Sequence, residues 1–115
     1  MDAKVIFHID EAQKWPLLLG NVTNLLLTFE DEVFNTEIKV LANSEAVKGY
    51  WEDTGGLPAS MEALSKKGVQ FLACHHAMQN MNITDEQIYS FVKIVPAGVR
   101  ELVDRQIEGY AYIKP

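Results

Sequence analysis

Short apolar segments alternate with segments of helical periodicity along this 115-residue chain, and no other feature constrains the fold as strongly. The apolar segments are rich in β-branched and aromatic residues and are bounded by turn-forming residues, which is typical of buried strands. Strands that alternate with helices imply parallel pairing, right-handed crossovers and helices on both faces of the sheet. We therefore predict a three-layer α/β/α domain over residues 1–115 with a mainly parallel five-stranded sheet. The predicted strands are residues 4–9, 36–42, 69–73, 92–95 and 110–113.

The first predicted helix, residues 14–29, is apolar over more than one face. Its main stripe follows helical spacing, with Pro16 tolerable in the first turn. Leu17, Leu19 and Leu27 lie off that stripe. A helix of this kind is typical of a buried position or of a contact between subunits.

The remaining helices are predicted from caps, breakers and apolar spacing. They are residues 45–51 after the N-caps Asn43 and Ser44, residues 60–68, residues 75–81, a segment capped by Thr84, and residues 96–109. The last of these places Val99, Leu102, Val103 and Ile107 on one face. Residues 52–60, with two glycines and a proline, are predicted to form the main loop.

Composition excludes several classes of function. Ten basic residues against 16 acidic ones give a net charge of -6, and the only basic pair is Lys66-Lys67, so we expect no nucleic-acid partner. No apolar run approaches the roughly 20 residues that span a bilayer, so we expect no membrane partner. One cysteine and the absence of a secretory signal favour the cytoplasm. No G-x-G-x-x-G or Walker pattern is present, which argues against dehydrogenases and kinases.

Polar residues follow the predicted strands, at the edge where an open parallel sheet binds its ligands. We expect a functional site at this edge, although helix caps alone would also place polar residues there. The candidate residues are His8 after the first strand, Asn43 and Ser44 after the second, Cys74, His75 and His76 after the third, and Pro96, Ala97 and Gly98 after the fourth.

Cys74 has two interpretations from the sequence. A thiol at a strand end that opens a helix is favoured as thiolate, the nucleophilic form. Free cysteine is also among the most buried residue types and often only packs. His8 could accept a proton from Cys74 if its strand neighbours the third strand; otherwise it is a hydrogen-bonded histidine at a strand end.

We predict no metal and no cofactor. His75 and His76 are adjacent, which seldom directs both rings to one ion, and no C-x-x-C or H-x-x-x-H spacing supplies further ligands. Trp15, Met78 and Met81 are interpreted as packing residues. The acidic pair Asp10-Glu11 is interpreted as a helix N-terminal charge.

Four segments together resemble the small DsrE/DsrF-like proteins: "KVIFHIDEAQKWPLLLGNVTNLL", "EIKVLANSEAV", "GVQFLACHHAM" and "VKIVPAGVRELVDRQIEGYAYIKP". The final pattern "VPAGVxELVxxQxEGYAYI" is the most specific part. The resemblance implies an α/β fold of flavodoxin-like appearance and a homotrimer or homohexamer. It also implies sulfur relay or sulfur oxidation, in which Cys74 carries a persulfide between sulfur-donor and sulfur-acceptor proteins.

Three hypotheses stay open from the sequence. The first is a persulfide carrier that uses Cys74. The second is a module that binds a small anion or a nucleotide-like ligand between helix N-termini, with Cys74 only lining the site. The third is an oligomeric scaffold built on the apolar helix of residues 14–29.

Overall fold

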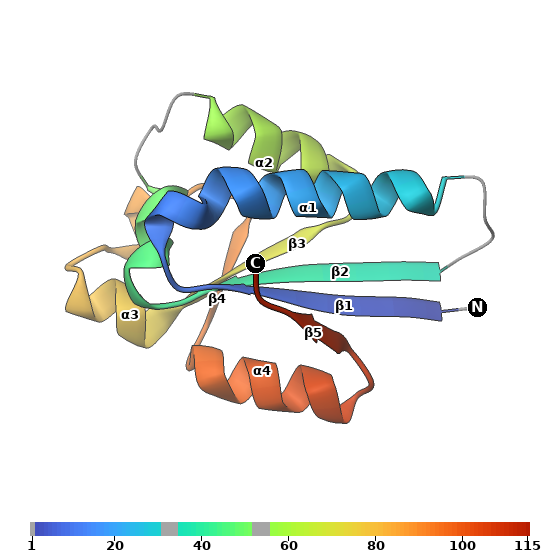
Figure 1. The fold of residues 1–115 in the computed structure, drawn as a ribbon. Helices are drawn as coiled ribbons and strands as arrows, with labels where there is room; N and C mark the ends of the chain where they lie inside the picture. Colours follow the sequence, from blue (N-terminus) through green and yellow to red (C-terminus); the bar gives the residue numbers. More distant parts are fainter. Residues whose placement is uncertain (1, 31–34, 52–55) are drawn as a thin grey trace.

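The computed structural model describes residues 2–30, 35–51 and 56–115, and alternates strands and helices along these ranges (Figure 1). The strands are β1 (Asp2–Ile9), β2 (Asn35–Ala42), β3 (Gln70–Cys74), β4 (Val92–Val95) and β5 (Ala111–Ile113). The α-helices are α1 (Trp15–Thr28), α2 (Leu57–Lys66), α3 (His75–Asn80) and α4 (Gly98–Ile107). The 3₁₀ helices are η1 (Ala12–Lys14), η2 (Ser44–Tyr50) and η3 (Asp85–Gln87).

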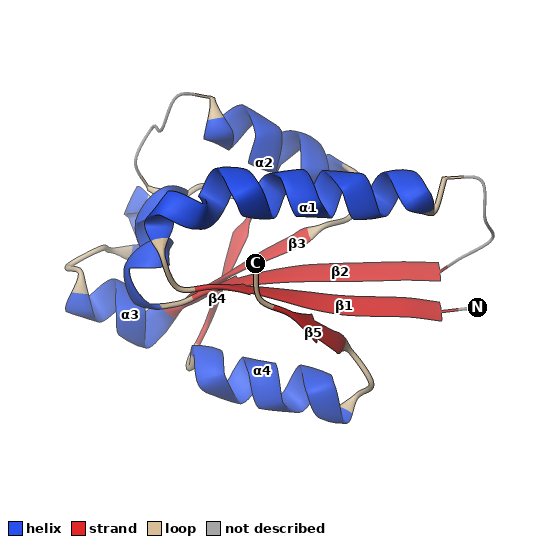
Figure 2. Ribbon diagram, in the orientation of Figure 1, coloured by secondary structure: helices blue, strands red, loops and turns tan. Residues whose placement is uncertain are grey.

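The five strands form one sheet in the order β4-β3-β2-β1-β5, and every pairing is parallel. Helices α1 and α2 cover one face, and α4 covers the other (Figures 1 and 2). The predicted three-layer α/β/α architecture is confirmed. Parallel strands need crossover connections, and the helices between them supply these connections.

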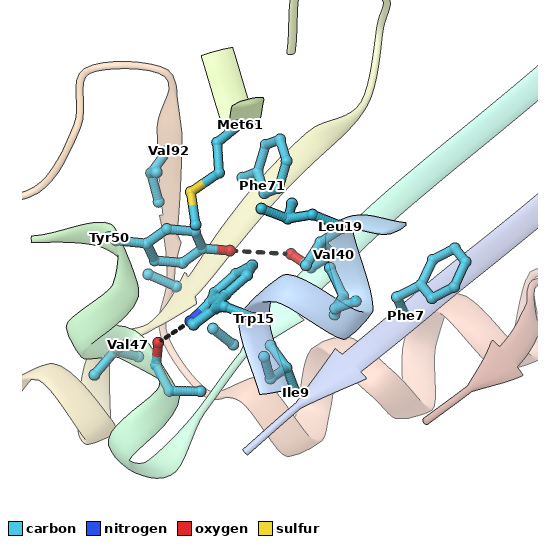
Figure 3. Close-up of a cluster of buried hydrophobic side chains, with 14 of the residues drawn as sticks. Phe7, Ile9, Trp15, Leu19, Val40, Val47, Tyr50, Met61, Phe71 and Val92 are labelled. Atoms are coloured by element: carbon cyan, nitrogen blue, oxygen red, sulfur yellow. Dashed lines mark hydrogen bonds between the residues drawn. The ribbon is translucent and has the colours of Figure 1, made fainter. Parts of the chain in front are cut away.

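The main core lies between the sheet and the α1 and α2 layer (Figure 3). Trp15, Tyr50 and Phe71 meet there with tilted or edge-on rings, a geometry that aromatic pairs prefer. Trp15 is 1% exposed, and its Nε1–H donates to Ala46 O at 2.8 Å. The Tyr50 hydroxyl donates to Leu72 O at 2.9 Å. The prediction that Trp15 packs in the core is confirmed.

A second, smaller core lies between the sheet and α4. It contains Ile6, Leu41, Leu72, Val95, Leu102 and Tyr110. Burial is the first cause of the raised pKa of Tyr110. Leu102 is the member of this cluster that comes from α4, so the helix contributes one buried hydrophobic side chain to this core.

The apolar face predicted for α4 is mostly exposed. Leu102 is 9% exposed, whereas Val99, Val103 and Ile107 are 68%, 47% and 78% exposed. These three residues are spaced by four, so their stripe runs along the flank of the helix rather than under it. Helices α1 and α2 shield one another on the opposite face, but α4 has no neighbouring helix alongside it in the described ranges (Figure 1).

Helix α2 begins earlier than predicted. Leu57–Lys66 is helical, so the second half of the predicted loop belongs to the helix, and residues 52–55 of that loop lie outside the described residues. Pro58 fits because the first turn of a helix needs no backbone N–H from that position. Gly56 precedes the helix with a φ of 95°, a backbone conformation that favours glycine.

Other boundaries agree closely with the predictions. Strand β4 matches residues 92–95, and Cys74 ends its strand as expected. The segment after Thr84 forms a capping box with Gln87 but continues for only one short 3₁₀ turn. Met78 is fully buried and Met81 packs against the core, as predicted. In the described part of the chain, no helix is both long and apolar enough to cross a bilayer.

Candidate functional site

Cys74 lies where β3 ends and α3 begins. It pairs with Val95 of β4 in the sheet, and it is 7% exposed. Its Sγ accepts a hydrogen bond from the backbone N–H of Gly98 at 3.3 Å. Gly98 is the first residue of α4, so the N–H that reaches the sulfur is one of those that a helix leaves without an internal partner. The two crossover connections after β3 and β4 therefore meet at the thiol.

The backbone of Gly98 comes close to two side chains. A Cβ on this residue would lie 3.2 Å from Cys74 Cβ, 3.4 Å from Cys74 Sγ and 3.3 Å from Asn43 Cβ. These separations are tighter than ordinary van der Waals contact. A side chain on this residue would push one of these neighbours away by a few tenths of an ångström. The close approach brings Asn43, Cys74 and Gly98 together from three different strand ends.

A hollow of about 330 Å³ opens beside the thiol. Cys74 and Asn43 form part of its wall, and Ser44, Glu45 and His76 lie around it. Ser44 and His76 are exposed. Cys74 is therefore nearly covered, with the Gly98 N–H against its sulfur, and the residue forms part of the wall of an open hollow.

His8 does not lie on a strand next to Cys74. Strand β1 pairs with β2 and β5, so β2 separates it from β3. The condition for direct proton transfer between His8 and the thiol is not met. His8 is instead hydrogen-bonded through both ring nitrogens: Nδ1 to Tyr112 Oη at 2.6 Å and Nε2 to Asn43 Oδ1 at 2.9 Å.

Asn43 therefore connects the histidine to the thiol region. It occupies the N-cap position of η2, but its side chain makes no capping hydrogen bond there. Its backbone N–H donates to Ile9 O at 3.1 Å and extends the pairing of β1 with β2 by one step. Its side chain is held from one side by His8 and meets Gly98 on the other.

A sequence model of the DsrE/DsrF-like family matches residues 22–115. The chain belongs to this family. The match covers β2 to β5 and hence Asn43, Cys74, Gly98 and Tyr112. His8 lies on β1, before the matched range. A search of the curated proteins finds no match.

Two solved structures resemble this DsrE/DsrF-like chain over its whole length. One is the protein of unknown function MTH1491 from Methanobacterium thermoautotrophicum, with 33% identity, a TM-score of 0.88, and coverage of 99% of this chain and 100% of that one. The other is the ychN protein from E. coli, with 16% identity, a TM-score of 0.74 and full coverage of both chains. The second likeness shows a shared fold alone.

The remaining predicted residues of the DsrE/DsrF-like site have different positions. Pro96 and Ala97 form the turn between β4 and α4 and place Gly98 against the thiol. His75 is half-buried at the start of α3, and His76 is exposed. Among the described residues, no group of three or more His, Cys, Asp or Glu side chains could hold a metal ion.

Tyr112 was not predicted as a site residue. In the sequence it belongs to the apolar segment "YAYI", and only the pairing of β5 with β1 places it beside His8. No pattern in the chain signals that pairing.

The acidic pair Asp10-Glu11 precedes a helix as interpreted, with Glu11 at the N-cap position of η1, but the Glu11 side chain makes no capping hydrogen bond and Asp10 lies one residue before the cap. Asp10 forms an ion pair with Lys114 at 3.1 Å, which fastens the segment after β5 to the end of β1. The hydrogen bond from Lys114 lowers the pKa of Asp10, and the same bond raises the pKa of Lys114. Asp10 follows His8 by two residues. The ends of β1 and β5 are therefore joined twice, by this ion pair and by the hydrogen bond between His8 and Tyr112.

Proposed function

We propose that this DsrE/DsrF-like protein carries sulfane sulfur as a persulfide on Cys74, between a sulfur-donor protein and a sulfur-acceptor protein. Membership of the family supports sulfur relay at a coarse level. The observation that carries the proposal is the hydrogen bond from the Gly98 N–H at the start of α4 to Cys74 Sγ. A backbone donor at a helix start favours negative charge on sulfur, which is the form that attacks and that must be stabilised after transfer.

The transfer needs no oxidant or reductant. The Cys74 thiolate attacks the outer sulfur of a donor persulfide, R–S–SH. A bond forms between Sγ and that sulfur as the donor's S–S bond breaks, and the donor cysteine leaves as a thiolate. Delivery reverses the exchange: an acceptor thiolate attacks the outer sulfur, and Cys74 is released as a thiolate.

The hollow suits the product of this reaction. Cys74 is 7% exposed, but it borders the open space that Ser44, Glu45 and His76 surround. The added sulfur lies one bond beyond Sγ and therefore gains access that the thiol itself lacks. A free thiol that cycles in this way requires a reducing compartment such as the cytoplasm.

A small-anion site is less well supported by the same hollow. Glu45 lies at its rim, and the Glu45 carboxylate already accepts the Ala12 N–H at 3.2 Å. A negative charge in this position opposes an anionic ligand. A persulfide differs from a free anion because it is covalently attached to Cys74, so the hollow need not attract it.

The carrier is proposed to act as a homotrimer or homohexamer. Helix α4 lies near β5 (Figure 1). It carries the exposed stripe of Val99, Val103 and Ile107, and Tyr112 and Ile113 of β5 are 41% and 37% exposed. Strand β5 is also at the edge of the sheet, so one side of it has no partner strand among the described residues. Apolar patches of this kind mark association surfaces.

The first test compares wild type with Cys74→Ser after incubation with a persulfide donor such as glutathione persulfide. Mass spectrometry of intact protein should show a gain of one sulfur atom in wild type and none in the variant. Urea unfolding should differ by less than about 1 kcal/mol, because the swap is small. Equal sulfur gain in both proteins would contradict the proposal.

A further inference from the structure

A hydrogen-bonded chain of side chains runs along the carboxyl edge of the sheet from β5 toward the thiol. It starts at Tyr112, passes through His8 and ends at Asn43. His8 is level with Leu41 of β2, and Leu41 is level with Leu72 of β3, two residues before Cys74. Paired residues of a parallel sheet point to the same face, and side chains two apart along a strand do so as well. His8 and Cys74 therefore share the α4 face, with Asn43 between them.

The chemistry of the chain sets its direction. Asn43 Oδ1 has no hydrogen to give, so His8 Nε2 carries the proton and donates it. In a neutral imidazole the other nitrogen is then an acceptor, and Tyr112 O–H donates to Nδ1. Each bond fixes the next, and the result is that the Oδ1 side of the Asn43 amide is directed at His8.

The opposite side of that amide carries two N–H donors. Within the described residues, Asn43 Nδ2 has no hydrogen-bond partner, and the side chain leaves its usual N-cap role unfilled. Asn43 Cβ and Cys74 Sγ both lie within 3.4 Å of the same point, the position of a Cβ on Gly98. Both side chains also border the same hollow. Asn43, whose amide N–H groups have no partner among the described residues, thus lines the same hollow as Cys74.

We propose that Asn43 donates a hydrogen bond to the outer sulfur of the Cys74 persulfide, and that His8 and Tyr112 are positioning residues that hold its amide in the donating orientation. This inference rests on the proposed carrier function and names the groups that stabilise its charged product. Gly98 N–H serves the inner sulfur, and Asn43 serves the outer one. Hydrogen bonds to charged groups are stronger than those between neutral groups, so loss of this donor should be measurable.

The test measures the rate at which a glutathione persulfide donor loads the protein. Asn43→Asp keeps the shape and the acceptor for His8 but removes the N–H donors, and it should slow loading at least about tenfold. Tyr112→Phe removes one hydroxyl from a half-exposed side chain and should slow loading about threefold. Asn24→Asp makes the same charge change on the exposed side of α1, across the sheet, and should load at the wild-type rate.

A double variant tests whether Tyr112 acts on loading through Asn43 or independently of it. If Tyr112 acts through His8 and Asn43, Tyr112→Phe should add nothing to the slow loading of Asn43→Asp. If the double variant instead slows loading by the product of the two single effects, Tyr112 and Asn43 act independently, and a positioning role of Tyr112 through His8 is contradicted. Nuclear magnetic resonance gives a second readout: the ring resonances of His8 should shift on loading in wild type and stay unchanged on loading in Asn43→Ala.

The outcomes distinguish this inference from the function beneath it. Wild type that gains no sulfur removes both the carrier function and the inference. Wild type that loads, with Asn43→Asp loading at the same rate, removes the inference alone. Slow loading of Asn43→Asp together with a shift of the His8 resonances in wild type supports both.

Discussion

At the residue scale, the position that tolerates least change in the site is Gly98. Its backbone touches Cys74 and Asn43 so closely that any side chain must displace one of them. The helix that it starts contributes the buried side chain of Leu102 to the core on this face of the sheet.

Gly98→Ala is expected to destabilise the protein by about 1–2 kcal/mol, because the new methyl group overpacks the contact with the thiol. The matched control is Gly20→Ala on α1, where a Cβ meets nothing within 4 Å. That change should stabilise by up to about 1 kcal/mol, because alanine favours a helix interior. Urea unfolding of both variants measures whether each change lowers or raises the free energy of unfolding. A stabilising effect at Gly98 would contradict the close approach.

At the scale of elements, the ion pair between Asp10 and Lys114 holds the segment after β5 against β1. The hydrogen bond from Lys114 lowers the pKa of Asp10 below its ordinary value of 3.8, so the folded state binds the proton less tightly than the unfolded state does. The stabilisation by this ion pair is therefore fully present above the pKa that Asp10 has in the unfolded state. It is lost as the pH falls through the lower pKa that Asp10 has in the folded state.

Asp10→Asn should accordingly be less stable than wild type at neutral pH, and the two proteins should converge in strongly acidic solution. Both side chains are partly exposed, so the difference is expected to be small and to shrink in about 1 M salt. Unfolding midpoints measured across pH at low and high salt test this. A difference that grew as the pH fell would contradict the assigned ion pair.

The sequence predicted most elements because their signals are local. Strand β4 is a run of β-branched residues between turn signals, and Cys74 follows such a run directly. The start of α2 was missed because glycine and proline read as breakers, whereas Pro58 is accommodated in a first helical turn. The exposure of Val99 and Ile107 was also hidden, because spacing identifies an apolar face without saying what covers it.

Prediction of the site followed the same division. Cys74 and Gly98 could be expected together because carboxyl ends of parallel strands converge. The place of His8 depended on strand order, which a single sequence does not specify. Because β1 pairs with β5, His8 is hydrogen-bonded to Tyr112. Its other ring nitrogen is bonded to Asn43, which lies between the histidine and the thiol region.

At the scale of the whole molecule, the apolar stripe of α4 and the open edge of β5 predict how copies associate. Ile107→Lys should lower the mass measured by light scattering toward that of one chain, because a buried charge without a partner opposes assembly. Its matched control is Leu27→Lys, also in the last turn of its helix and 55% exposed.

The two variants also separate two surfaces. If Leu27→Lys dissociates the assembly and Ile107→Lys does not, the contact is made by α1, as the scaffold hypothesis expects. A wild-type protein that is already a monomer would remove the assembly proposal altogether.

The pairing of β1 with β5 has a consequence for synthesis. These strands are the first and the last described in chain order, and Tyr112 bonds to a histidine 104 positions earlier. While the ribosome makes the other strands, one edge of β1 has no partner and could pair with a neighbouring nascent chain. The chain through His8 is completed only when β5 emerges. A sulfur-loading assay on stalled nascent chains would therefore follow the last step of folding as well as the chemistry.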